Sequence, residues 1–280
     1  MQQFFSDLIS YQFLQNAFMA GFLVSIACGI VGTYIVARRL VFLSGGITHS
    51  SFGGIGIAYY YGLNPIFGAF VFSALSAIGI EYFADKTKMR EDSASGILWA
   101  LGTAVGVIFV AMTPGYAPNL MSFLFGGLLG VTHLDRWIML LLVIALILLF
   151  AFGFRTILYV AFDKEFSITQ GAPVKLINYL MMVLISLTIV MCIRVVGIVL
   201  LIALLTIPVV TANIFYKNFK NIMLSSVVWG FAGMMVGLYL SFELNLPSGA
   251  AIILAQSGIW LICKAVEWAK SPSRQTNKHT

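Results

Sequence analysis

The chain has 280 residues, of which 60% are hydrophobic and only 9% are charged. Soluble domains carry roughly 25% charged residues, so this composition excludes an ordinary water-soluble protein. The formal net charge is +6, but no basic patch alternates with aromatic residues, which argues against a nucleic-acid partner. Apolar runs of about 20 residues recur along the chain, which is the length of a helix that crosses a bilayer. The sequence therefore predicts an all-α, polytopic transmembrane bundle.

We expect nine membrane segments, because nine apolar runs of sufficient length are separated by short polar stretches. Their ranges are 11–36, 46–62, 65–84, 94–113, 136–154, 176–194, 197–215, 222–242 and 248–267. The segment 46–62 is short and rich in glycine, which suggests a broken or re-entrant helix buried against its neighbours. All nine belong to one transmembrane domain over 1–269. A polar cytoplasmic tail over 270–280 follows, and we expect it to be disordered.

The basic residues predict the orientation of the chain in the membrane. One set of loops and the C-terminal tail together hold fourteen of the 16 Lys and Arg residues, whereas the opposite side holds only Arg136 and Arg194. Positively charged loops remain in the cytoplasm, so the larger set lies there. With nine segments, the N-terminus then lies outside and the C-terminus is cytoplasmic.

The stretch 42–56, "FLSGGITHSSFGGIG", places a histidine among five glycines and four hydroxyl side chains. Imidazole is the commonest metal ligand among side chains, so His49 is a candidate ligand, with Thr48 and Ser44 as weaker oxygen donors. Glycines such as Gly45, Gly46 and Gly53 permit close backbone approach of helices. The alternative is that His49 only hydrogen-bonds across a glycine-packed helix pair.

Other polar residues lie near the predicted ends of the membrane segments. We interpret Glu81 and Asp85 as an interfacial charge cluster with the lysines that follow them. Arg194 ends a span on the outer side, where a long cationic side chain can extend toward water. His133 and Asp135 lie in an outer stretch, and we interpret them as exposed interfacial residues; capture of a cation there is the alternative.

The longest cytoplasmic segment, 154–176, contains an acidic group followed by the small-residue break "QGAP". This pattern predicts a short amphipathic helix that ends at Gly171. Asp163 and Glu165 lie at its start, and the helix serves either as an interfacial element or as a docking surface for a soluble partner. Pro208 lies in the seventh predicted span, where it removes a backbone hydrogen-bond donor, so we expect a kink in that helix. Such kinks occur at gates, and many others are only structural.

Sequence signatures of hydrolysis are absent from the chain. There is no GxxxxGK[ST] nucleotide-binding loop, no HExxH and no GxSxG motif. Carboxylates at membrane depth are scarce, although a proton- or sodium-coupled carrier normally needs them. We therefore expect no hydrolysis on this chain, and we expect the energy for any transport through it to come from elsewhere.

Four motifs in order resemble the membrane permease of metal-ion ATP-binding-cassette importers, the zinc, manganese and iron type. They are "GTYIVARRLVFLSGGITHSSFGGIGIA", "YVAFDKEFSITQGAP", "VGIVLLIALLTIPVVTANIF" and "LPSGAAIIL". The likeness runs from about residue 11 to 267. The resemblance implies a multi-pass permease of the bacterial cytoplasmic (inner) membrane, in contact with lipid, with no permanently bound cofactor.

The resemblance also implies partners and residue roles. A second permease copy completes the pathway, and two cytosolic ATPase subunits, which bind the ATP, dock at Asp163 to Gly171. An extracytoplasmic metal-binding protein delivers the ion. In the family an Asp and a His of one segment face the pathway; His49 matches the His, whereas Gly45 stands where the Asp is expected.

The loss of that carboxylate points to zinc as cargo, because manganese prefers oxygen ligands. Alternatives are manganese, iron or a chelated metal such as a siderophore or haem. A secondary carrier or channel that needs no ATPase is an alternative of a different class.

Overall fold

The computed structural model describes residues 10–114 and 130–270, and we find only helices and their connections in these ranges. The long helices in chain order are α2 (Gln12–Ala37), α3 (Val41–Tyr60), α4 (Pro65–Thr87), α5 (Glu91–Met112), α7 (His133–Phe162), α9 (Val174–Val196), α10 (Ile198–Phe215), α11 (Phe219–Leu244) and α12 (Ser248–Ala269). A short helix, α8 (Lys164–Thr169), lies between α7 and α9. The all-α membrane bundle is therefore confirmed.

Each of the nine predicted segments coincides with one long helix. Eight of these helices in the described residues are long and apolar enough to cross a membrane, and α3 is the long helix outside that set. The helix α3 is continuous from Val41 to Tyr60, so the expectation of a broken helix is wrong. Its burial against neighbours is as expected, whereas the count of nine crossings, the orientation and the division at residue 269 stay predictions. Residues 271–280 lie outside the described residues.

Local sequence explains where several helices begin and end. Asn64 caps α4 by accepting a hydrogen bond from the Ile66 backbone N–H at 2.9 Å, and Pro65 occupies the first helical position. The helix α7 begins with a capping box, in which Thr132 and Asp135 satisfy each other's backbone N–H groups. Gly197 separates α9 from α10 with φ of +81°, a conformation that favours glycine.

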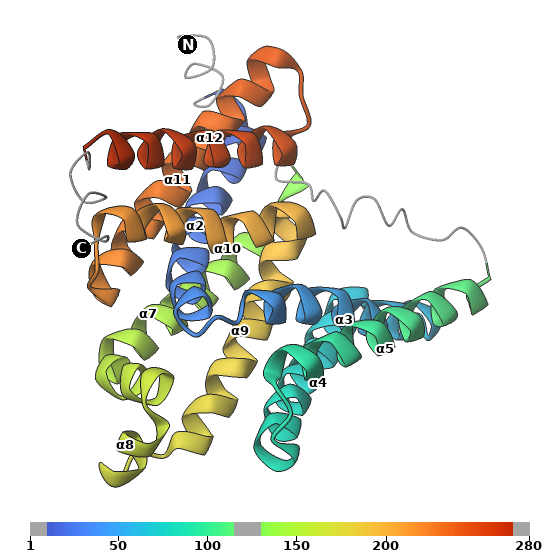
Figure 1. The fold of residues 1–280 in the computed structure, drawn as a ribbon. Helices are drawn as coiled ribbons and strands as arrows, with labels where there is room; N and C mark the ends of the chain where they lie inside the picture. The colour runs from blue at the N-terminus through green and yellow to red at the C-terminus, as the bar shows by residue number, and fades with distance from the viewer. Residues whose placement is uncertain (1–9, 115–129, 271–280) are drawn as a thin grey trace, which may run out of the picture.

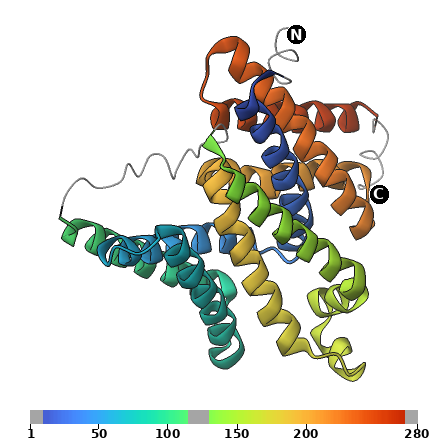
Figure 2. The same ribbon diagram turned by 180° about the vertical axis from the view of Figure 1, so that it is seen from behind.

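The bundle is built around three helices. In the 18-residue apolar stretch of each helix, the share of buried residues is 72% in α2, 61% in α9 and 50% in α10. The share in α5 is only 17%. Figures 1 and 2 show α2 in the middle of the molecule, with α7, α9, α10 and α11 around it. The outward faces of α5 and α7 are apolar, as expected for surfaces covered by lipid or by a second membrane chain.

The helices α3, α4 and α5 form a lobe on one side of the bundle (Figure 1). Their backbones approach closely because small residues face one another across both pairs of helices. A Cβ atom at Gly54 of α3 would collide with the carbonyl oxygen of Gly68 of α4, and one at Gly56 would lie 2.5 Å from the carbonyl oxygen of Gly106 of α5. This arrangement is the small-residue packing common between membrane helices.

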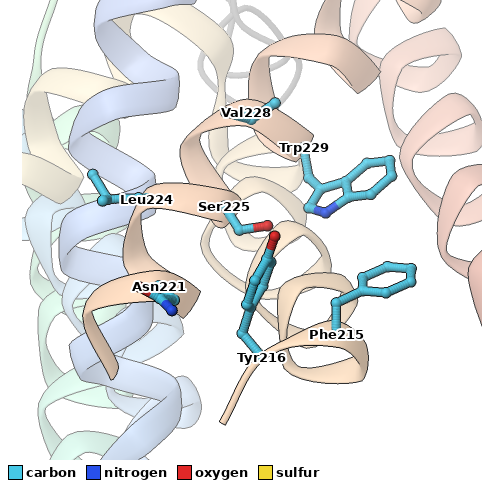
Figure 3. A pocket seen from close by; sticks show the side chains of 7 residues that line it. All are labelled: Phe215, Tyr216, Asn221, Leu224, Ser225, Val228 and Trp229. Atoms are coloured by element: carbon cyan, nitrogen blue, oxygen red, sulfur yellow. The ribbon is translucent and has the colours of Figure 1, made fainter. Parts of the chain in front are cut away.

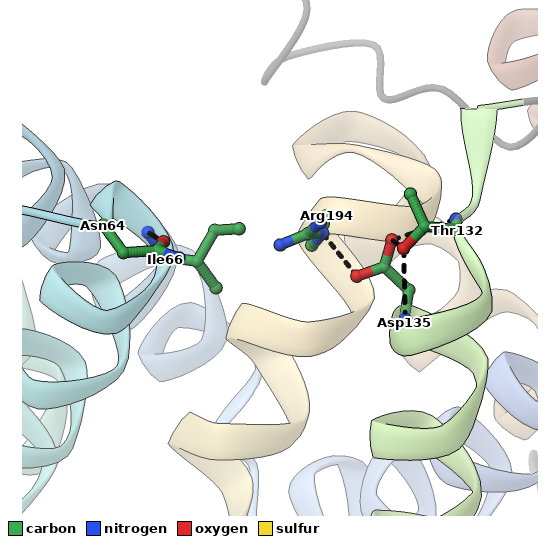
Figure 4. A network of polar contacts seen from close by, with 5 residues as sticks. All are labelled: Asn64, Ile66, Thr132, Asp135 and Arg194. Atoms are coloured by element: carbon green, nitrogen blue, oxygen red, sulfur yellow. Dashed lines mark hydrogen bonds and ion pairs between the residues drawn. The ribbon is translucent and has the colours of Figure 1, made fainter.

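The ends of the bundle differ in their polar contacts. At one end Arg38 pairs with Glu91 at 3.0 Å, and Lys175 lies 3.6 Å from Asp85. At the other end Arg194 and Asp135 form an ion pair, with the Arg194 Nε 2.6 Å from Asp135 Oδ1, and Figure 4 shows this pair close to the start of α4. Arg38, Asp85 and Lys164 line one cavity at the first of these ends.

One interpretation of polar residues is wrong. Asp135 is 3% exposed, so it is not an exposed interfacial carboxylate. Glu81 is also buried, at 4% exposure, but it lines one cavity with charged residues, namely Asp85, Lys164 and Lys175. Asp135 is buried because it caps α7 and pairs with Arg194, which therefore does more than extend toward water. His133 is exposed and hydrogen-bonds Arg136. The part of the outer stretch from 115 to 129 lies outside the described residues.

Candidate functional site

His49 lies in α3 and is partly exposed on the side that faces α5. Its ring stacks on the indole of Trp99, with ring centroids 4.3 Å apart and an interplanar angle of 4°. In the described part of the chain we find no hydrogen bond to either nitrogen of the imidazole. Stacking occupies a face of the ring, whereas a metal binds in the ring plane, so both nitrogens stay available as ligands.

Thr48 and Ser44 do not join His49 in a ligand set. Both side chains are fully buried. The Thr48 hydroxyl donates to the Ser44 carbonyl oxygen at 2.7 Å, and the Ser44 hydroxyl donates to the Val41 carbonyl oxygen at 2.7 Å. Hydroxyls bonded back to the preceding turn stay on their own helix. Their role as ligands stays a prediction that this geometry does not favour.

The glycines around His49 have different surroundings. A Cβ atom at Gly46 would collide with the Ser95 side chain, and one at Gly53 would lie 3.0 Å from the Gly102 carbonyl oxygen, so both positions hold α3 against α5. At Gly45 the nearest atom to an added Cβ is a ring carbon of Trp99 at 3.8 Å, an ordinary contact. Gly45 is therefore not required for helix packing, and a larger residue fits at its Cβ position.

The described residues of one copy do not supply a complete metal site. Within the described ranges no group of three or more His, Cys, Asp or Glu side chains lies close enough together to hold a metal ion. A zinc site needs three or four ligands. With the residues that the structure describes, His49 completes such a site by adding water or ligands from another copy.

The predicted short helix in segment 154–176 is confirmed as α8. The Asp163 side chain caps it by accepting a hydrogen bond from the Phe166 backbone N–H at 2.9 Å. At the other end the Ala172 N–H donates to the Ser167 carbonyl oxygen at 3.0 Å, and Gly171 adopts φ of +70°. This is a Schellman ending, which needs a residue in the left-handed conformation, usually glycine. Asp163 and Gly171 thus define the two ends of α8.

The helix α8 lies at the end of the bundle that also carries Arg38 and Asp85, and Figures 1 and 2 show it beyond the ends of its neighbours. Glu165 is exposed, and so are the apolar side chains of Phe166 (44%) and Ile168 (64%). Exposed apolar side chains beside a charged residue are typical of a surface that binds another protein.

Pro208 lies inside α10 and is buried. The helix continues through it from Ile198 to Phe215, and the proline faces Gly230 of α11, where an added Cβ would lie 3.6 Å from the proline Cγ. The proline therefore contributes to packing between α10 and α11. A role in gating stays a prediction.

Sequence reasoning missed a buried polar network at the α8 end of the bundle. Arg38 donates to the Tyr34 hydroxyl at 3.1 Å, to Glu91 Oε1 at 3.0 Å and to Asn178 Oδ1 at 3.4 Å, and so joins α2, α5 and α9. Asn178 also lines one cavity with Glu81 of α4, beside this network. The sequence signal was a doublet, Arg38–Arg39, at a helix end, but its partners are 53 and 140 residues away.

A cavity of about 650 Å³ lies between the end of α10 and α11, and Figure 3 shows its aromatic lining of Phe215, Tyr216 and Trp229. It contains none of the predicted site residues. Its lining has no carboxylate, imidazole or thiol, so it offers no metal ligand of the usual kinds.

The comparisons with known proteins agree with this architecture. The family model described as the ABC 3 transport family matches residues 10–267. The chain belongs to this family. An uncharacterized membrane protein of Synechocystis sp. is 39% identical over 257 residues, covering 92% of both chains. The manganese transport system membrane protein MntC of Halalkalibacterium halodurans is 32% identical, covering 92% of this chain and 89% of its own.

A solved structure, PsaBC from Streptococcus pneumoniae in complex with Fab, contains a chain that is 30% identical, with a TM-score of 0.82 and coverage of 94% of each chain. The resemblance to permeases of metal-ion ABC importers is therefore confirmed. Membership of the ABC 3 transport family also makes the chain a multi-pass protein of the cytoplasmic membrane and a transport subunit, with ATP hydrolysis on partner subunits. These similarities favour a permease of this family over an ATPase-independent carrier.

Proposed function

We propose that this chain is the permease of an ATP-driven importer of divalent transition-metal ions, and that zinc is its preferred cargo. The observation that carries the proposal is His49, whose ring nitrogens are free while Gly45, one turn earlier, offers no carboxylate. Imidazole suits zinc, whereas manganese prefers carboxylate and carbonyl oxygens.

We propose that the metal pathway forms between two copies of the chain. Symmetric association places the same residue of each copy about a common axis, so two His49 side chains can meet there. Two imidazoles and water make a weak site, and a weak site suits transport because a tight one would trap the ion. An extracytoplasmic metal-binding protein would deliver the ion at the end of the bundle opposite α8.

The second candidate cargo is manganese, which is favoured by the similarity to the manganese transport system membrane protein of H. halodurans. The two candidates differ in what they require of position 45. A carboxylate there would add a hard oxygen ligand one helical turn from His49. The presence of glycine supports zinc.

Uptake of zinc and manganese by the reconstituted complex tests both parts of the proposal. We expect wild type to prefer zinc and His49→Ala to lose at least about tenfold in zinc uptake, since even residues that only support metal ligands cost 10- to 100-fold. We expect Gly45→Asp to raise manganese uptake relative to zinc. Unchanged transport of both metals by both variants would remove His49 from the mechanism, and a wild-type preference for manganese would overturn zinc as the cargo.

A further inference from the structure

Glu81 of α4 is a buried carboxylate that the proposed transport pathway does not use. It is 4% exposed, and its Oε2 atom has no hydrogen-bond partner among the described residues. Asn178 of α9 lines the same cavity as Glu81. A buried carboxylate oxygen without a hydrogen-bond partner raises the free energy of the folded protein, so a donor that reaches this oxygen stabilises the fold.

Glu81 lines a cavity of about 550 Å³ that lies between α4, α8 and α9. Lys164, the first residue of α8, lines the same cavity, together with Asp85 and Asn178. Lys164 is exposed and makes no ion pair within the ranges that the structure describes. An unpaired ammonium on a flexible stem and an unpaired carboxylate oxygen therefore face one cavity.

We propose that Glu81 is a positioning residue for energy coupling, and that Lys164 forms an ion pair with Glu81 Oε2 when an ATPase subunit presses α8 toward the bundle. This inference rests on the proposed function, in which α8 is the docking element. The cavity provides room for α8 to move. Because both ends of α8 are capped, the helix can move as a unit. Lys164 is the basic residue of α8, and it adjoins the capping residue Asp163.

The fold shows how such a pair would reach the metal site. Glu81 belongs to α4, whose backbone touches that of α3 at Gly68 and Gly54. Helix α3 carries His49, so displacement of α4 at the α8 end shifts the helix that holds the ligand. Packed helices transmit such displacements because their interfaces do not deform continuously.

The test uses the complete complex and measures metal uptake per ATP hydrolysed. We expect Glu81→Gln and Lys164→Gln each to lower this ratio at least about fivefold, the lower range of coupling between sites. The double exchange Glu81→Lys with Lys164→Glu restores it, an outcome that a merely structural role would not give. Asp85→Asn and Lys175→Gln, from the exposed pair beside the same cavity, are the matched controls and leave the ratio within about twofold.

A cross-linking experiment keeps the proposal testable if the exchanged pair fails to fold. Glu81→Cys with Lys164→Cys should form a disulfide on mild oxidation more readily when a non-hydrolysable ATP analogue is bound than without nucleotide. Equal cross-linking with and without the ATP analogue would contradict the proposed ion pair. So would single variants whose metal uptake per ATP hydrolysed equals that of wild type. A wild-type chain that retains no ATPase subunit would instead overturn the proposed function itself.

Discussion

At the scale of single residues, the contact between His49 and Trp99 determines how the proposed metal ligand is held. The indole covers a face of the imidazole at 4.3 Å and is itself in contact with Phe42, with ring centroids 5.8 Å apart. An aromatic pair of this kind contributes about 0.5–1.5 kcal/mol beyond its buried area. Trp99 therefore restricts the orientation in which His49 presents its nitrogens.

We predict that Trp99→Ala lowers the apparent affinity for zinc about two- to twelvefold, the factor that corresponds to loss of the stacking energy. Trp99→Phe keeps a ring against His49 and should retain most of the affinity. Initial uptake rates across zinc concentrations measure the effect.

The matched control for Trp99 is Phe42→Leu, which changes the other neighbour of the indole without touching His49. It should leave zinc uptake unaltered. An alanine variant with the affinity of wild type would show that the stack does not position the ligand.

The sequence identified His49 but not its partner, for a physical reason. Local pattern shows that His49 lies among small residues, and imidazole chemistry follows from the residue type alone. Trp99 is 50 residues later on another helix, and the register of α3 against α5 depends on glycine contacts that no local pattern encodes. The burial of Glu81 was not predicted because its sequence neighbours are charged, whereas the helical turn directs its side chain into the bundle.

At the scale of elements, the close approach of α3 to α4 and α5 decides how rigid the His49 lobe is. Membrane helices gain little from hydrophobic exclusion in lipid, so contact between backbones must supply much of the association. Gly54 and Gly68 meet across α3 and α4, and each would place a Cβ atom against the other's carbonyl group.

We predict that Gly54→Ala destabilises the permease by about 1–3 kcal/mol, the usual cost of adding a methyl group to a filled contact. Thermal unfolding in detergent measures the change as a lower midpoint. Gly258→Ala is the matched control, because no atom lies within 4 Å of its added Cβ. There alanine should be neutral or stabilising, since glycine costs about 1 kcal/mol inside a helix. Equal midpoints for both variants would mean that the α3–α4 contact is not tight.

The elements were largely predictable because each long helix is an apolar run bounded by turn residues. Apolar length locates a membrane helix, and residues such as Asn64, Pro65 and Gly197 mark the ends. The continuity of α3 was not predictable, since its glycines are equally consistent with a break in the helix. They are tolerated because neighbouring helices cover them on both sides.

At the scale of the whole molecule, the distribution of charge and the fold agree on two distinct ends. Arg38, Asp85 and Lys164 surround one cavity of about 460 Å³ at the α8 end. Asp135 and Arg194 pair at the other, near Asn64 (Figure 4). Helix α3 connects these ends, since it follows Arg38 and precedes Asn64. Its path therefore favours a membrane crossing, although its composition is less apolar than that of the other long helices.

We predict that α3 crosses the membrane, which makes nine crossings and places the loop before α4 outside the cell. Leu63→Cys should react with a membrane-impermeant maleimide on intact cells, because Leu63 is 59% exposed. Lys86→Cys and Gln170→Cys should react only after the membrane is opened, since basic loops remain in the cytoplasm. The native cysteines Cys28, Cys192 and Cys263 are buried and give little background.

A topology in which α3 does not cross the membrane predicts the opposite labelling of these cysteines, and it is disfavoured by the distribution of basic residues. If α3 stayed on one side, the loops at Leu63 and Arg38 would share a compartment, and Lys86, Lys88 and Arg90 would face outward. Labelling of Lys86→Cys on intact cells, with Leu63→Cys protected, would establish that arrangement. It would also divide the basic residues between the two sides, against the charge bias that orients membrane proteins. The nine-crossing arrangement keeps the basic loops and α8 on the side where ATP is available.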